Sequence, residues 1–97
     1  MIYVKLHEEG VVAMADAEVI GKEFEEGDLY LQVSERFYKG EEKNKEEVVK
    51  LMKEANNLNI VGKEVVGIAL EGGFIKKDDV KVIQGVPHVQ VYRIHQG

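Results

Sequence analysis

Apolar and polar side chains alternate along three short stretches of this chain, at residues 2–7, 29–33 and 88–93. Successive side chains of a β-strand point to opposite faces of a sheet, so the alternation predicts strands with one buried and one polar face. The polar phase carries Tyr3, Lys5, His7, Tyr30, Gln32, His88, Gln90 and Tyr92. We call this predicted surface the tyrosine face. It is amphipathic and rich in hydrogen-bonding groups, so it is suited to contact a partner, whose identity the pattern does not give. Its candidate interaction residues are Tyr3, Lys5, Tyr30, Gln32 and Tyr92.

Short glycine-containing loops separate strand-like runs in three places, which predicts three β-hairpins. The paired runs are residues 2–7 with 11–15, 22–24 with 29–33, and 80–84 with 88–94. The run 11–15 is apolar in both phases, which is typical of a central strand covered on both faces. Pro87 stands before the last run, where it does not need to donate to the ladder.

An amphipathic helix is predicted over residues 45–57. Asn44, followed three residues later by Glu47, is typical of the capping box that starts a helix. Asn56 or Asn57 is expected to end this helix in a left-handed conformation. These two and Asn59 are three of the four asparagines of the chain. These asparagines lie close together in the sequence either because the backbone needs left-handed residues there or because they bind a ligand. We favour the backbone explanation.

A second, nearly all-apolar helix is predicted over residues 64–70. Asp16 and Ser34 are each placed to cap a single helical turn that follows them, and residues 41–45 are expected to form a solvated connection. Together the elements predict an α+β fold. It has a mostly antiparallel sheet of about five or six strands built from hairpins, with two helices packed on one face.

The length of 97 residues predicts one globular domain over residues 1–97. The runs at the two ends carry few of the residues that normally protect a sheet edge. If one of them stays at an edge, a weak or moderate homodimer is slightly favoured over a monomer, either through that strand or through the tyrosine face.

Composition narrows the classes of function. The net charge of −5 argues against general nucleic-acid binding, which needs Lys and Arg to neutralise phosphates. Abundant Glu and Lys with few labile residues is typical of a thermophile, although a Lys/Glu-rich mesophile looks similar. Because Cys is absent, there is no disulfide, thiolate zinc site or cysteine nucleophile. The chain starts on strand-like sequence and has no membrane-length apolar run, so we expect a cytoplasmic protein.

Candidate chemistry is sparse. Ser34 is the one hydroxyl that a catalytic triad could use, and its position favours a helix cap. His7 and His88 share a strand phase, and with Asp16 they make a minimal metal set. Ordinary strand-end histidines are the favoured interpretation, because no ligand-like spacing supports a metal. No cofactor is predicted.

The tyrosine face has three interpretations. Aromatic side chains on a sheet can stack the bases of single-stranded RNA, but the aromatic-basic sequence of such modules is missing. Cross-strand tyrosine pairs that stabilise the sheet are favoured over base stacking. The third interpretation, a binding surface for a protein partner or for a second copy of the chain, ranks between these two.

Four segments of the chain resemble an uncharacterised archaeal family, domain of unknown function 424. They are Val12-Ala13-Met14-Ala15-Asp16-Ala17-Glu18 running to Gly21-Lys22, then Phe37-Tyr38-Lys39-Gly40, Asn59-Ile60-Val61-Gly62 and Gly85-Val86-Pro87-His88-Val89-Gln90. The resemblance implies an archaeal cytoplasmic protein and, loosely, an accessory role around translation or ribosome assembly. It carries no catalytic signature. The matching positions that we take as candidate functional residues are Asp16, Lys22, Tyr38, Asn59, His88 and Gln90.

The leading hypothesis is a non-enzymatic binding module whose partner is a protein or a ribonucleoprotein. The alternative is a small enzyme or metal-dependent domain that uses His88, His7 and Asp16. The two differ in one structural expectation, because the alternative requires these three side chains to surround one concave site.

Overall fold

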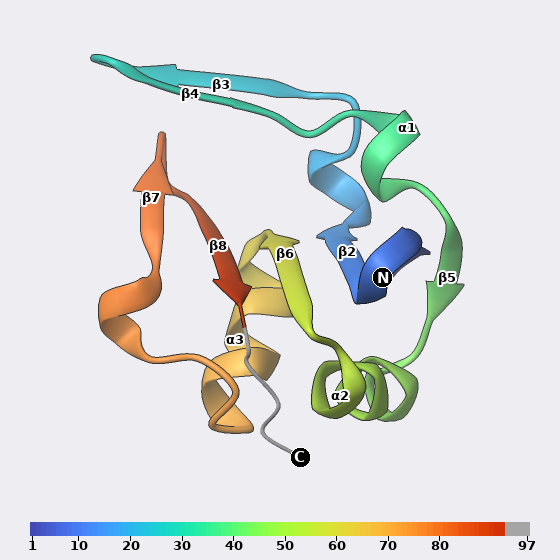
Figure 1. Cartoon of the computed structure of the whole chain (residues 1–97). Helices are drawn as coiled ribbons and strands as arrows, with labels where there is room; N and C mark the ends of the chain where they lie inside the picture. The colour runs from blue at the N-terminus through green and yellow to red at the C-terminus, as the bar shows by residue number, and fades with distance from the viewer. Residues whose placement is uncertain (93–97) are drawn as a thin grey trace.

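The computed structural model describes residues 1–92 and shows one large sheet with helices behind it (Figure 1). The strands are β1 (Ile2–Leu6), β2 (Val11–Asp16), β3 (Glu23–Glu26), β4 (Leu29–Gln32), β5 (Glu41–Lys43), β6 (Asn57–Val61), β7 (Lys81–Ile83) and β8 (Val86–Tyr92). Six of them form a sheet in the order β5-β1-β2-β6-β8-β7, and β3 pairs with β4 in a separate two-stranded sheet. All neighbouring strands run antiparallel except β2 and β6. The predicted α+β class is confirmed.

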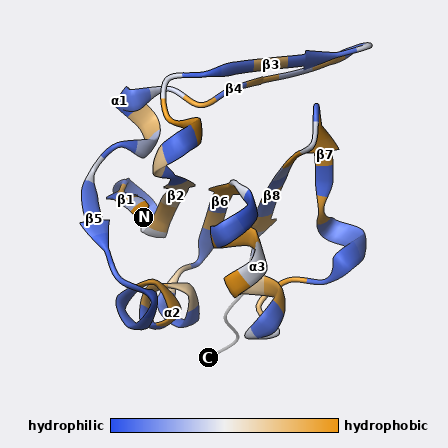
Figure 2. Ribbon diagram, turned by 180° about the vertical axis from the view of Figure 1, so that it is seen from behind, coloured by the Kyte–Doolittle hydropathy of each residue, from blue (hydrophilic) through white to orange (hydrophobic). Residues whose placement is uncertain are grey.

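The two predicted helices cover one face of the large sheet. They are α2 (Lys45–Glu54) and α3 (Lys63–Glu71), and Figure 2 shows them from their own side of the molecule. The main core lies between these helices and the apolar phase of the strands. Its largest fully buried side chains are Ile2, Met14, Val48, Met52, Leu58, Ile60, Val65 and Val89. Full burial of side chains of this size contributes roughly 1.5–3 kcal/mol each, so this layer is the main source of stability.

The opposite face of the large sheet is covered only in part. Its cover consists of the β3–β4 hairpin, the turn η2 (Ala17–Val19) and the short helix α1 (Glu35–Tyr38), which lie across one end of the sheet (Figure 1). A second apolar cluster packs there, made of Ala13, Ala15, Val19, Leu31, Val33, Tyr38, Val61 and Ile83. The small side chains of Ala13 and Ala15, both fully buried, let this cover approach β2 closely. This confirms that residues 11–15 form a central strand.

The edges of the sheet differ from the prediction. β1 pairs with both β2 and β5, and β8 pairs with both β6 and β7, so neither terminal strand is an edge. The edges of the large sheet are the three-residue strands β5 and β7. The expected solvated connection over residues 41–45 is therefore wrong, because Glu41–Lys43 pairs with β1 through its backbone. A homodimer through an exposed terminal strand loses its basis, and self-association through the polar face stays a prediction.

The asparagine cluster also lies in a different conformation from the one expected. The capping box of Asn44 and Glu47 is confirmed, but α2 ends at Glu54. Asn57 and Asn59 lie within β6, and Asn56 lies just before it. Among residues 1–92 the non-glycine residues with positive φ are Glu9 and Gln84, so the left-handed interpretation of the asparagines is wrong. The chain leaves α2 directly into a strand that pairs with β2, and this leaves no room for a left-handed turn.

Pro87 lies inside β8. The sequence pattern predicts it before the strand, and that expectation is wrong. Its carbonyl accepts the N–H of Gly62 on the β6 side at 2.9 Å. Residues 93 and 94 of the predicted last strand lie outside the described part of the chain. Within the described part, no helix is long and apolar enough to cross a lipid bilayer.

Candidate functional site

The uncovered part of the polar face lies over β6 and β8. The register places Asn57 opposite Tyr92, Asn59 opposite Gln90, and Val61 opposite His88. Directly opposite residues of a sheet share a face, so these side chains form one surface. We call Asn57, Asn59, His88, Gln90 and Tyr92 the polar strip. Its neighbours Leu58, Ile60 and Val89 point the other way, into the helix-covered core.

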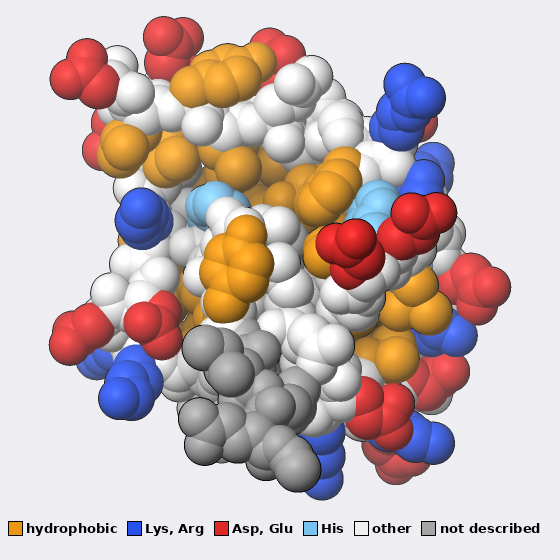
Figure 3. All heavy atoms as spheres, viewed as in Figure 1, with side chains coloured by type: hydrophobic (Ala, Val, Ile, Leu, Met, Phe, Trp, Pro, Cys, Tyr) orange, Lys and Arg blue, Asp and Glu red, His pale blue; other side chains and the backbone are white. Residues whose placement is uncertain are grey.

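The polar strip offers both a flat aromatic ring and uncharged hydrogen-bonding groups. Tyr92 is 73% exposed, and the amide of Gln90 donates to its hydroxyl at 3.2 Å. The side-chain oxygen of Asn57 is buried, and no donor within residues 1–92 bonds to it. Figure 3 looks onto this face, where histidine and apolar side chains lie among uncharged surface and the charged groups lie mostly toward the margin. The strip can therefore give and receive hydrogen bonds without a strong field of either sign.

A concavity of about 220 Å³ adjoins the strip next to β7. It is lined by Asp79, Lys81, His88, Gln90 and Tyr92. Burial lowers the pKa of His88, and the positive charge of Lys81 lowers it further. His88 therefore stays neutral at neutral pH and presents one donor and one acceptor nitrogen.

The lowered pKa of His88 predicts a loss of stability in acid. The unfolded chain takes up a proton near the ordinary value of 6.5, whereas the folded chain binds it only at lower pH. Between the two pKa values the unfolded state binds more protons, so the free energy of unfolding falls as the pH falls through that window. We expect wild type to lose more stability between about pH 7 and about pH 5 than His88→Gln does. Guanidinium denaturation at both pH values measures the difference, and equal losses would contradict the assignment.

The polar side chains of β1, together with His7 directly after it, hold α1 against the sheet. The ammonium of Lys5 donates to the carbonyl of Arg36, and a ring nitrogen of His7 lies 2.8 Å from the carbonyl of Phe37. The His7 ring stacks on that of Phe37, with centroids 4.4 Å apart. The ammonium of Lys39 also lies over Tyr3, 5.8 Å from its ring centroid. Tyr3, Lys5 and His7 are thus engaged within the molecule.

Tyr30 and Gln32 lie on the separate hairpin. Tyr30 faces Glu25 across the β3–β4 pair and is 57% exposed. A hydrogen bond to Glu23 raises the pKa of Tyr30. The predicted tyrosine face is therefore not one surface, because its members divide among the polar strip, the contact with α1 and this hairpin. Alternation within a strand defines the phase of a side chain but not the sheet to which the strand belongs.

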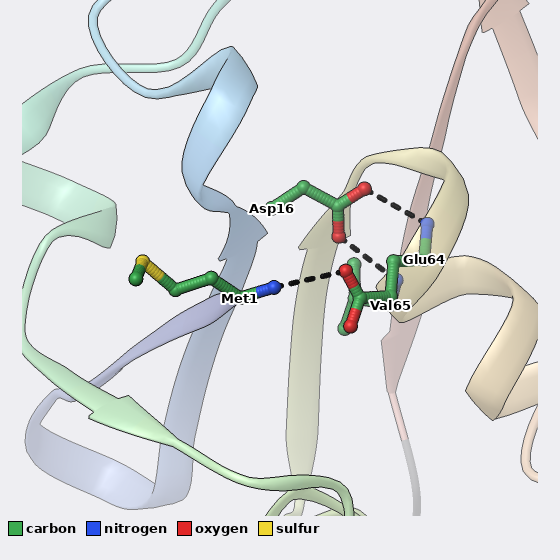
Figure 4. Close-up of polar contacts among 4 residues, drawn as sticks. All are labelled: Met1, Asp16, Glu64 and Val65. Carbon is green, nitrogen blue, oxygen red and sulfur yellow. Dashed lines mark hydrogen bonds and ion pairs between the residues drawn. The ribbon is translucent and has the colours of Figure 1, made fainter.

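Asp16 joins β2 to the start of α3. Its buried carboxylate accepts the N–H groups of Glu64 at 2.8 Å and Val65 at 2.9 Å (Figure 4). The N-terminal amine of Met1 binds the Glu64 carboxylate at 3.0 Å beside it. Burial raises the pKa of Asp16, while the two backbone hydrogen bonds lower it. The predicted turn at Ala17–Val19 exists, but Asp16 does not cap it with its side chain and caps α3 in its place.

The three members of the proposed metal set lie apart. Asp16 lies at the start of α3, His7 packs on Phe37, and His88 lines the concavity beside β7. Within residues 1–92, no group of three or more His, Cys, Asp or Glu side chains is arranged to hold a metal ion. These three side chains therefore do not surround one concave site, and the alternative of an enzyme or metal-dependent domain loses the shared site that it required.

The remaining candidate positions are also dispersed. Tyr38 is buried against β2, and burial raises its pKa to about 12, so its phenol stays protonated. Lys22 is exposed and, together with Lys63, lines a different cavity of about 250 Å³ near the β7–β8 turn. Of the six candidate positions, Asn59, His88 and Gln90 come together in the polar strip.

Sequence reasoning missed two residues of this region. Asn57 was assigned to a helix end, although it stands two residues before Asn59 and thus shares its strand phase. Lys81 reaches the strip only because β7 pairs with β8, with Lys81 directly opposite His88. A strand prediction for residues 57–61 could have found the first of these residues.

The fold and the polar strip define a small α+β protein with one partly uncovered polar sheet face. The chain belongs to the family described as "Protein of unknown function (DUF424)", whose model matches residues 4–94. No curated protein matches the chain. The structure is similar to the crystal structure of an uncharacterized conserved protein from Methanopyrus kandleri, with a TM-score of 0.79 and 23% sequence identity. The likeness covers 99% of this chain and 94% of that chain, and at this identity it shows the fold alone.

Proposed function

We propose that this protein is a non-enzymatic binding module that contacts a protein partner through the polar strip. The exposed ring of Tyr92 beside the amides of Asn59 and Gln90 carries the proposal. Tyrosine contributes a large contact area and a hydroxyl at low entropic cost, and it is enriched in protein interfaces. Amide side chains both donate and accept hydrogen bonds, which suits an uncharged polar partner surface.

The charges near the strip favour a protein over a nucleic acid. Among the described residues, Lys81 is the one cation lining the concavity, and Asp79 lines it as well. Phosphate binding needs several Lys or Arg side chains, and the chain has a net charge of −5. If the partner is a ribonucleoprotein, we propose that the strip contacts its protein component. The family resemblance makes translation and ribosome assembly the first setting to search.

The inventory of nucleophiles also supports binding over catalysis. The hydroxyl of Ser34 accepts the N–H of Phe37 at 3.2 Å and caps α1, as predicted. A hydroxyl that accepts a backbone N–H in a helix cap serves a structural role, and nucleophilic catalysis would require a base to activate it.

Loss of the exposed strip side chains is expected to weaken partner capture. The double variant Gln90→Ala/Tyr92→Ala should retain its partner at least about tenfold more weakly, because a buried interface tyrosine contributes about 2 kcal/mol or more. Affinity capture from native lysate, with and without ribonuclease, followed by quantitative mass spectrometry, measures retention.

The chain supplies a matched control for this experiment. Tyr30→Ala/Gln32→Ala removes the same two residue types from the exposed β4, and we expect it to retain wild-type partners. Substitutions at exposed sites of this kind usually change stability little. Identical partners for wild type and both double variants would show that the strip is not the binding surface. Loss of all partners after ribonuclease treatment would point to RNA.

A further inference from the structure

Among residues 1–92, Val82 is the residue whose backbone groups lie free at the outer edge of β7. Val82 lies opposite Pro87, whose carbonyl points away from β7 and accepts the N–H of Gly62 at 2.9 Å. Directly opposite residues of two antiparallel strands alternate between pairs that bond to each other and pairs that do not. In a pair of the second kind, both residues direct their N–H and C=O groups away from the partner strand. Pro87 directs its carbonyl toward β6, so Val82 directs its N–H and C=O toward the open edge. One residue of an added strand can pair with both groups.

An apolar groove lies directly beside this edge, on the helix side of the sheet. Its volume is about 390 Å³, and its apolar lining comes from Val66, Gly67, Leu70, Val80, Val82 and Pro87. Figure 2 shows α3, β7 and the segment between them from this side. The side chain of Val82 is 52% exposed. The edge and the groove thus form one continuous surface.

Gly67 keeps the groove open. A Cβ at this position would meet no atom within 4 Å, so the neighbouring residues do not require glycine here. Glycine in the interior of a helix costs roughly 0.5–1 kcal/mol relative to alanine. The absence of a side chain in the middle of α3 leaves space for a side chain from outside.

The charges at the groove indicate the chemistry of its occupant. Lys63 and Lys77 are the charged residues of its lining, and neither forms an ion pair within the described residues. A second copy of the chain would bring the same two lysines toward them, and like charges placed opposite each other oppose association. An acidic partner complements them.

We propose that the β7 edge and this groove bind an extended segment of a partner protein by strand addition. The backbone of the segment pairs with Val82, its apolar side chains enter the groove, and acidic side chains at its ends meet Lys63 and Lys77. Strand addition draws affinity from main-chain hydrogen bonds and specificity from alternate side chains. This surface is separate from the polar strip, so the inference stands whether or not the strip binds a partner.

A synthetic peptide with the sequence Glu-Thr-Val-Thr-Val-Thr-Glu, blocked at both ends, is the test ligand. Its odd positions place two valines between two glutamates on one side of a strand. In an NMR titration we expect the amide of Val82 to shift downfield and to become protected from solvent exchange. The amides of β5, the other edge, should not respond, because Glu41 and Glu42 repel the peptide.

Variants separate the parts of the surface. Val82→Pro removes the outward N–H but no bond to β8, and we expect roughly tenfold weaker binding. Gly67→Leu fills the groove without changing β7 and should weaken binding similarly. A peptide with Lys in place of both Glu, and one N-methylated at both valines, should not bind. Amide spectra of each variant confirm that the fold is kept.

Several results would overturn the inference. One is the absence of any response to the glutamate-containing peptide at millimolar concentration, and another is equal binding of the peptide with Lys in place of both Glu. Undiminished binding by Val82→Pro, or shifts confined to other surfaces, would also contradict it. A Val82 amide shift that depends on protein concentration without peptide would assign the edge to a second copy.

Discussion

Replacing Gly62 with alanine is expected to lower the free energy of unfolding by about 3 kcal/mol or more. Gly62 has φ 121° and ψ 153°, a conformation that is essentially restricted to glycine. A Cβ there would also lie 2.3 Å from the carboxyl carbon of Asp16. The strain and the clash act together, because moving the backbone away would break the cap of α3. Guanidinium denaturation followed by circular dichroism measures the loss.

Gly67→Ala is the matched control in the same helix region. It has open space and an ordinary helical conformation, so we expect a gain of about 0.5–1 kcal/mol. Gly62→Ala with near wild-type stability would show that the backbone at Gly62 can relax and that the contact with Asp16 is dispensable.

Replacing Asp16 with alanine is expected to cost roughly 2–4 kcal/mol. The variant leaves the N–H groups of Glu64 and Val65 at the start of α3 without their acceptor, in a region where Asp16 is only 2% exposed. A buried donor without a partner has given up its hydrogen bonds to water and forms none in the protein, so its desolvation lowers the stability of the folded state. Denaturation midpoints and hydrogen exchange at the two amides measure the effect, and exchange should rise first at Glu64 and Val65.

Asp16→Asn separates hydrogen bonding from packing. Asparagine keeps the shape and one acceptor oxygen, so we expect a loss smaller than that of the alanine variant. The control Asp78→Ala removes an exposed carboxylate and should change stability by a few tenths of a kcal/mol. If Asp16→Ala lowered stability as little as Asp78→Ala, water would be accepting the N–H groups of Glu64 and Val65 in the variant.

These two residues explain part of the family resemblance in structural terms. Asp16 belongs to the segment of residues 12–18 and Gly62 to the segment of residues 59–62, and the structure brings them into contact. Tyr38, from a third segment, is buried in the second apolar cluster. Architecture therefore accounts for Asp16, Gly62 and Tyr38. The other four candidate positions, Lys22, Asn59, His88 and Gln90, have no such role, and the last three of them form part of the polar strip.

Local pattern was sufficient to predict most of the elements. The capping box of Asn44 and Glu47 and the cap at Ser34 were recognisable because both bonds join residues three apart. The hairpins and the buried β2 follow from alternation and from turn residues, whose effects extend over a few neighbours. These signals depend on the residues themselves and their nearest neighbours, so they can be recognised before the chain is folded.

The neighbours of each element depended on contacts between distant residues. Asp16 caps a helix whose bonded amides lie 48 and 49 positions away, and no local pattern encodes that distance. Glu41–Lys43 pairs through its backbone alone and leaves no periodicity of side chains. The parallel pairing of β2 with β6, and the assignment of Tyr30 to a separate hairpin, likewise depended on how the strands assemble. Phase along a strand is local and already placed His88 and Gln90 on one face. Strand order is set by packing over the whole chain, and packing alone brought Asn59 beside these two residues.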